Sequence, residues 1–143
     1  KTLEAALARH PYDREILLAL ASYERDAGNV TKAAQRAKLL VELEPDNAAY
    51  VDSLGWVLFK RGKTAESLKE LLRAESLMKE ITAEDAEILD HIAQAHDKLN
   101  QRAKAEEYWR RVLDLKPEAR ALIDRDRQFL HDRLAGSLLI QVP

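Results

Sequence analysis

The chain has 143 residues, of which 46% are hydrophobic and 34% charged, and its formal net charge at pH 7 is -2. This charge does not favour nucleic acid, which needs a strongly basic face, and the absence of cysteine excludes disulfides and thiolate metal sites. No stretch approaches the roughly 20 apolar residues of a membrane-spanning helix, so the totals favour a single all-helical domain without membrane insertion.

The sequence repeats itself along most of its length. Gly28 and Gly62 stand 34 residues apart in matching contexts, and Asn100 follows 38 residues after Gly62. A fixed period of this size is typical of arrays of helix pairs. The same offsets align the apolar and small positions Leu20 with Leu54 and Ile92, Ala33 with Ser67 and Ala105, and Leu43 with Leu77 and Leu115.

The first 12 residues read as the second helix of a truncated unit, over about Thr2 to Arg9, closed by His10-Pro11. Because Lys1 already stands in this helical pattern, we expect the chain to be a fragment with any targeting segment upstream. No signal-peptide pattern opens the sequence.

The first complete unit spans residues 13–47 and has the signals of two helices. Asp13 is placed to cap a helix over about Arg14 to Asp26, and Gly28 ends it where a left-handed residue is needed. A second helix is predicted from about Val30 to Leu43. Pro45-Asp46-Asn47 then breaks and restarts the chain.

The second unit, residues 48–82, is predicted as a helix over Ala48 to Arg61, a turn at Gly62, and a helix from Thr64 toward Lys79. No proline stands at position 79, so the four extra residues of this unit are expected to lengthen its second helix and its connection. Gly55 lies in mid-helix, which costs about 1 kcal/mol relative to alanine. We therefore expect another helix to approach closely there.

The third unit spans residues 83–117, and Thr82-Ala83-Glu84-Asp85 at its boundary resembles a helix start. Its helices are predicted over about Ala83 to Leu99 and Arg102 to Leu115, with Asn100 as the left-handed turn residue. Pro117 suits the first turn of a capping helix over residues 118–135. The apolar tail, residues 136–143, has no helical pattern.

These units resemble the tetratricopeptide repeat family, whose 34-residue helix pair carries the pattern W-x2-L-G-x2-Y…A-x3-F…P. The central unit reads Val51-x2-Leu54-Gly55-x2-Leu58 and then Ser67-x3-Leu71. The resemblance covers about Thr2 to Pro117. It implies an all-α superhelix of antiparallel helix pairs, with about three units followed by a capping helix.

The resemblance also implies a concave groove lined by the first helix of each unit. Carried over by the alignment, the lining positions are Glu15, Leu18, Ser22, Arg25 and Asp26; Ala49, Asp52, Trp56, Phe59 and Lys60; and Glu87, Asp90, Gln94, Asp97 and Lys98. Ten of them form the predicted binding site for a peptide or protein segment: Leu18, Ser22, Arg25, Asp52, Trp56, Phe59, Lys60, Asp90, Gln94 and Asp97.

The centre of this predicted groove allows two interpretations. Trp56 and Phe59 lie off the main apolar stripe of their helix, so they either pack on the flanking first helices or bind a partner. The lining carries six acidic and three basic residues, which suits an apolar peptide with a basic residue. Some family members clamp a peptide carboxylate with Lys, Asn and Arg, but here Leu18, Ser22, Ser53, Glu87 and His91 stand at those places.

The histidines do not indicate catalysis. His91 and His96 are five residues apart, about 140° around a helix, and no His-Glu-x-x-His motif is present. Asp90, His91, His96 and Asp97 could form a hydrogen-bonded group, but packing or surface polarity explains them better than metal or acid-base chemistry. With no glycine-rich phosphate loop, no cofactor or metal is expected.

The sequence therefore predicts a non-catalytic adaptor that binds a protein or peptide. The alternative is self-association through the terminal repeats or the apolar C-terminal tail. An enzyme would need a site from parts of the protein outside this chain. The sequence Asp52-Ser53-Leu54-Gly55-Trp56 resembles that of bacterial arrays, including envelope-associated ones. This resemblance favours a location in the bacterial periplasm or cell envelope over the cytoplasm.

Overall fold

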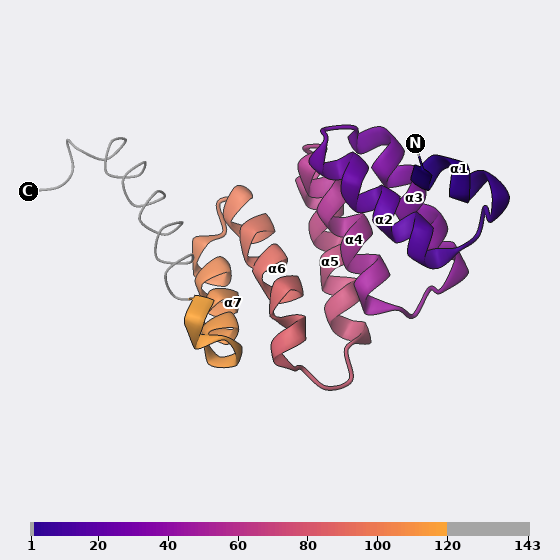
Figure 1. Ribbon diagram of the computed structural model, residues 1–143. Coiled ribbons are helices and arrows are strands. Elements are labelled where there is room, and N and C mark those ends of the chain that lie inside the picture. The colour runs from indigo at the N-terminus through magenta and orange to yellow at the C-terminus, as the bar shows by residue number, and fades with distance from the viewer. Residues whose placement is uncertain (1, 120–143) are drawn as a thin grey trace, which may run out of the picture.

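The computed structural model describes residues 2–119, which form seven α-helices and two 3-10 turns, with no strand in that range (Figure 1). Residues 120–135 of the predicted capping helix and the tail lie outside these residues. The elements are α1 (Thr2–Arg9), α2 (Arg14–Asp26), α3 (Val30–Leu43), α4 (Ala48–Lys60), α5 (Thr64–Leu77), η1 (Ala83–Asp85), α6 (Ala86–Lys98), α7 (Arg102–Leu115) and η2 (Pro117–Ala119).

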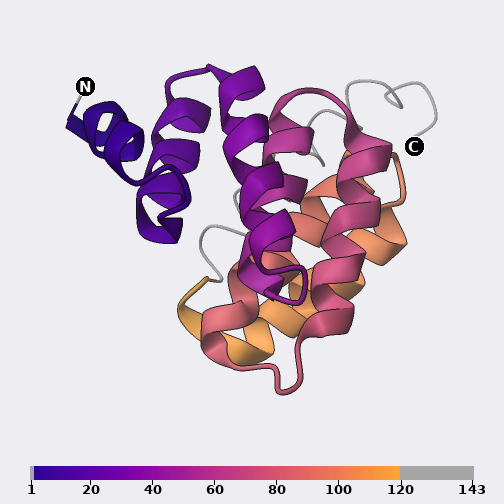
Figure 2. The ribbon, with the colours of Figure 1, turned by 90° about the vertical axis from the view of Figure 1, so that its right-hand side faces the viewer.

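The helices pair in chain order, and the pairs stack side by side. Helix α2 packs on α3, α4 on α5 and α6 on α7, while α3 contacts α4 and α5 contacts α6. Figures 1 and 2 show the pairs following one another, with α1 and α7 at opposite ends of the stack. The first helices also touch, since α4 contacts both α2 and α6. The predicted all-α array is therefore confirmed.

The turns inside the pairs follow the sequence prediction. Gly28 and Gly62 both have a φ of 87°, and Asn100 has a φ of 63°. Asparagine tolerates this left-handed region better than other residues with a Cβ, so it can replace the glycine of the earlier units. Asp13 and Asn47 cap α2 and α4 as expected, by accepting the backbone N–H of Ile16 and of Tyr50.

The extra residues of the second unit lengthen the connection after α5, as predicted, but not the helix itself. Helix α5 ends at Leu77 after 14 residues, the length of α3, so the expectation that the extra residues lengthen it is wrong. They lie in the segment 78–85, where the backbone of Thr82 donates to the carboxylate of Asp85 at 2.8 Å. This reciprocal cap fixes a 3-10 turn, and α6 begins three residues later than predicted, at Ala86.

Large apolar side chains and small residues alternate in the core. Leu71, Leu89 and Ile92 are fully buried in the main cluster, which joins α4, α5, α6 and α7. Alanines carry the contact between α3 and α4, where Ala37 packs on Leu54 and Leu58. These small side chains allow α3 and α4 to pack closely. The pair α4–α5 is therefore packed against α3 on one side and against α6 and α7 on the other.

Helices α4 and α5 lie in close contact at Gly55. A Cβ added there would stand 2.7 Å from Cδ2 of Leu71 and 3.3 Å from the Leu71 backbone nitrogen. The hydroxyl of buried Ser67 donates to the carbonyl of Gly55 at 2.6 Å. The predicted close contact at this mid-helix glycine is confirmed.

We expect Gly55→Ala to lower the free energy of unfolding by about 1–3 kcal/mol, as overpacked core sites do. Helix propensity alone would predict the opposite change, because alanine is favoured over glycine in a helix interior by about 1 kcal/mol. Urea unfolding measures it, with Ser53→Ala on the same helix as a control that adds no atom near α5. In the Gly55→Ala background, Leu71→Ala should cost less than it does alone, because it removes the clash. Additive costs would contradict this account.

A polar contact joins the second helices of the last two pairs. Glu75 on α5 accepts hydrogen bonds from the hydroxyl of Tyr108 at 2.8 Å and from Nη1 of Arg111 at 2.7 Å, both on α7. Burial, followed by the hydrogen bond to Glu75 and its charge, raises the pKa of Tyr108 from 10.0 to about 12, against the opposing effect of Arg111. The fold thus favours the neutral phenol.

This shift predicts a pH dependence. A group whose pKa is raised on folding contributes stability that is present below pH 10.0, its unfolded value, and is lost as the pH rises through about 12. Urea unfolding across that window should show a decline for the native chain that is smaller in Tyr108→Phe. An absorbance titration should likewise lose its step near pH 12 in that variant. Identical pH profiles would rule out this contribution.

Candidate functional site

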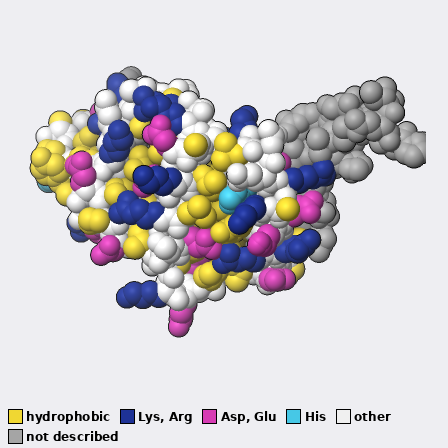
Figure 3. Space-filling view, turned by 180° about the vertical axis from the view of Figure 1, so that it is seen from behind, with side chains coloured by type: hydrophobic (Ala, Val, Ile, Leu, Met, Phe, Trp, Pro, Cys, Tyr) yellow, Lys and Arg dark blue, Asp and Glu magenta, His cyan; other side chains and the backbone are white. Residues whose placement is uncertain are grey.

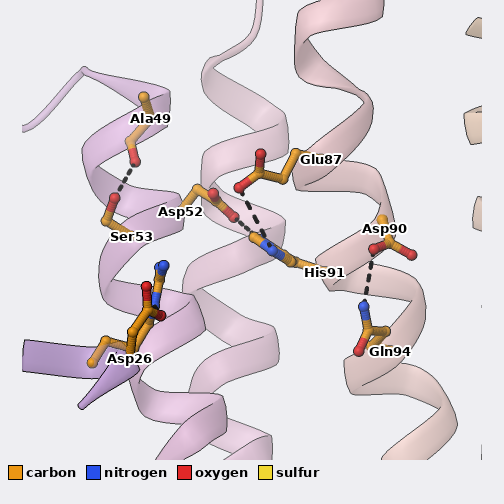
Figure 4. Close-up of polar contacts among 9 residues, drawn as sticks. Asp26, Ala49, Asp52, Ser53, Glu87, Asp90, His91 and Gln94 are labelled. Carbon is orange, nitrogen blue, oxygen red and sulfur yellow. Dashed lines mark hydrogen bonds and ion pairs between the residues drawn. The ribbon is translucent and has the colours of Figure 1, made fainter. Parts of the chain in front are cut away.

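Side chains from α4 and α6 meet where these two first helices lie against each other. Asp52 and Trp56 are four residues apart and share one face of α4, as Glu87 and His91 share one face of α6. Figure 4 shows Asp52, Glu87 and His91 directed toward one another across the gap between the helices. Together with Phe59 and Lys60, these residues form what we term the α4–α6 cluster.

Asp52 and His91 form the buried polar link of this cluster. Nδ1 of His91 lies 2.8 Å from Oδ1 of Asp52, and the two residues are only 6% and 8% exposed, respectively. An ionised carboxylate only accepts hydrogen bonds, so Nδ1 carries the shared proton. The other ring nitrogen, Nε2, lies 3.9 Å from Oε1 of Glu87, which is longer than a hydrogen bond. Glu87 itself is largely exposed.

Trp56 lies in a stack of three rings. Its ring centroid is 4.6 Å from that of Phe59 and 3.9 Å from that of His91, with interplanar angles of 8° and 11°. Two such nearly parallel rings would overlap on one side of the indole, so they cover opposite faces. Nζ of Lys60 lies 5.0 Å from the indole centroid. Both faces of the Trp56 ring are therefore covered by side chains of the same chain. The edge of the Trp56 ring and the half-buried ring of Phe59 are available to a partner.

The other predicted site residues do not join this cluster. Asp90 accepts hydrogen bonds from Gln94 at 2.9 Å and from Nε1 of Trp109 on α7 at 3.0 Å. Figure 4 shows Asp90 and Gln94 turned away from the Asp52–His91 pair. On α2, Nε of Arg25 donates to Asp26 at 3.2 Å. The remaining predicted site residues, Leu18 and Ser22 on α2 and Asp97 on α6, are half-buried.

The histidines have different partners. His91 binds Asp52, whereas Nδ1 of His96 lies 2.6 Å from Oε1 of Gln101 at the end of its own helix. The single hydrogen-bonded group considered for Asp90, His91, His96 and Asp97 is therefore not what the described contacts show. The sequence pattern did not indicate the pairing of His91 with Asp52, although the repeat alignment put both Asp52 and Glu87 among the lining positions.

Charges around the cluster are mixed. Within residues 2–119, neither Asp52 nor Glu87 forms an ion pair with a lysine or arginine, and the ionisable partner of each is His91. On the face drawn in Figure 3, acidic and basic side chains are intermixed among hydrophobic ones. Such a mixed surface suits protein partners.

A hollow lies at the start of the array, between α1, α2 and α3. Its volume is about 570 Å³, and Leu3, Leu20, Tyr23 and Glu24 are among the residues that line it. The carboxylate of Glu24 accepts from both Nε and Nη2 of Arg36, at 3.2 and 3.3 Å. Its charge is thus neutralised within the array, so the α4–α6 cluster remains the better candidate site.

A sequence profile described as tetratricopeptide repeat matches residues 2–123. The chain belongs to the tetratricopeptide repeat family. The three stacked helix pairs, α2–α3, α4–α5 and α6–α7, are its repeats. Arrays of this kind present extended surfaces for binding other proteins and are generally scaffolds rather than catalysts. None of the helices described is long and apolar enough to cross a membrane.

Solved structures resemble this chain in fold. A crystal structure of MamA has a TM-score of 0.68 at 23% identity, over 80% of this chain and 65% of that one. MamA from Desulfovibrio magneticus RS-1 has a TM-score of 0.69 at 14% identity, over 81% and 63%. PilF from Pseudomonas aeruginosa has a TM-score of 0.70 at 20% identity, over 97% and 65%. This chain thus spans less than two thirds of each, and no curated protein matches its sequence.

The buried Asp52–His91 link predicts a specific stability effect. Asp52→Ala leaves the Nδ1–H of His91 buried without an acceptor, and such a loss costs about 1–3 kcal/mol of unfolding free energy. The matched control is Asp26→Ala, because Asp26 is a solvent-exposed carboxylate on α2 and should change stability by less than about 0.5 kcal/mol. Urea unfolding of both variants measures the difference. Equal stabilities would show that the link does not hold α4 against α6.

Proposed function

We propose that this array binds a peptide or an extended protein segment along its first helices, centred on the α4–α6 cluster, without doing chemistry. The observation that carries this proposal is the pair of partly exposed rings, Trp56 and Phe59, on a helix whose other apolar side is already buried. Exposed charges of Lys60 and Glu87 stand beside them. An aromatic centre with a charged rim is typical of interaction hot spots.

Helix α4 is apolar on two sides, which distinguishes it from its neighbours. Val51, Leu54 and Leu58 are buried in the core, so one apolar side is fully used by the array. Phe59 packs only at the margin of the main cluster and remains partly exposed. Apolar surface kept at the centre of an inner helix favours a partner there.

The charges of the cluster indicate the chemistry of the partner. Asp52 is hydrogen-bonded to His91, and Asp90 accepts hydrogen bonds from Gln94 and Trp109. Part of each carboxylate is therefore already occupied by a donor within the chain. Glu87, with a side chain that is 74% exposed, remains open to a basic group. A segment that places an apolar side chain on Phe59 and a lysine or arginine near Glu87 fits this surface.

A random peptide library displayed on phage tests this proposal with the purified chain as bait. We expect the selected peptides to combine apolar residues with lysine or arginine. Phe59→Ala should weaken their binding by about 2 kcal/mol, roughly 30-fold, as truncation of a hot spot does. Fluorescence anisotropy of a labelled selected peptide measures the affinity.

The matched control is Tyr12→Ala, which removes an aromatic ring that is 66% exposed and lies outside the cluster. Circular dichroism should show that both variants fold. If peptides bind Phe59→Ala and Tyr12→Ala equally well, or if all selected peptides are acidic, the binding surface lies elsewhere.

A further inference from the structure

We propose that Asp52, Glu87 and His91 bind a divalent transition-metal ion such as Zn²⁺ between α4 and α6. One potential ligand atom from each of these residues lies within 4.8 Å of the other two. The residues come from two different repeats, and the sequence separates Asp52 from His91 by 39 positions. The inference goes beyond the proposed function, because it requires no peptide.

The present distances are close to those of a coordination shell. Zinc binds nitrogen and oxygen at about 2.0–2.2 Å, so two ligands of a tetrahedral ion stand roughly 3.4 Å apart. Nδ1 of His91 lies 2.8 Å from the carboxylate of Asp52, and a carboxylate oxygen of Glu87 lies within 4.8 Å of a ligand atom of each of these residues. An ion bound by Nδ1 takes the place of the proton shared with Asp52, and the neutral ring then carries its proton on Nε2. Because the Glu87 side chain is 74% exposed, it is free to move closer and complete the coordination shell.

The donor set suits a borderline metal ion. Imidazole nitrogen favours zinc, nickel and cobalt over calcium and magnesium, and carboxylate oxygens complete such sites in many proteins. Two carboxylates this close repel each other, and within residues 2–119 neither is paired with a lysine or arginine. A divalent cation would offset that repulsion, whereas Lys60 lies against the Trp56 ring instead.

The two buried ligands of the proposed site, Asp52 and His91, are already held in position by the array. Only 6% of His91 is exposed. Its ring is hydrogen-bonded to Asp52 and stacks on Trp56, with 3.9 Å between the ring centroids. Held ligands lose little freedom on binding. Exposed Glu87 borders the solvent, so the remaining coordination positions are open to water or to a side chain of a partner. The ion would join the second repeat to the third.

Isothermal titration of the untagged chain with ZnCl₂, after chelator treatment and dialysis, tests the proposal. We expect saturable binding of one ion per chain. Glu87→Gln and His91→Gln should each weaken it at least about tenfold, since even changes outside the ligand shell cost 10–100-fold. The matched controls are Glu84→Gln, an exposed acid before the same helix, and His96→Gln, a second buried histidine on it. Both should bind zinc as the native chain does.

A second readout separates binding from folding. Zinc should raise the unfolding temperature of the native chain and of Glu84→Gln, and should raise that of Glu87→Gln clearly less at the same zinc concentration. Because the Glu87 side chain is exposed, its variant decides the question even if His91→Gln does not fold. The absence of saturable binding to the native chain would overturn the proposal. Native-like affinity in Glu87→Gln, or an equal loss in His96→Gln, would overturn it as well.

Discussion

The close contact between α4 and α5 at Gly55 is the constraint on which the candidate site depends. Without a Cβ at this position, Leu71 packs directly on the α4 backbone and Ser67 donates to the Gly55 carbonyl. That contact sets the rotation of α4 about its axis. Since Asp52 and Trp56 project from another side of the same helix, their direction toward α6 follows from it.

The α4–α6 cluster combines structural and recognition roles in neighbouring side chains. Asp52 and Trp56 hold His91, so they couple the second repeat to the third and belong mainly to the packing of the array. Phe59, Lys60 and Glu87 are more exposed and can be altered with less effect on folding. In repeat arrays each unit is stabilised chiefly by its neighbours, so a link of this kind supports both the stack and its binding surface.

Local patterns predicted most of the backbone. The period, the caps at Asp13 and Asn47, and the left-handed turns depend on a few adjacent residues, so they could be read without tertiary information. The length of α5 could not, because nothing in its own sequence stops it. The helix ends at Leu77, and residues 78–81 separate it from the turn that the cap between Thr82 and Asp85 begins.

By itself, the sequence determined the repeat, the helix pairs and the position of the small residues, because each depends on spacing along one helix or turn. It also placed Asp52, Trp56, Phe59 and Glu87 on the lining helices. Only the tertiary structure decided that His91 binds Asp52 and covers one face of Trp56. These contacts depend on how α6 is rotated against α4, and that rotation is set by packing across two repeats rather than by any local pattern.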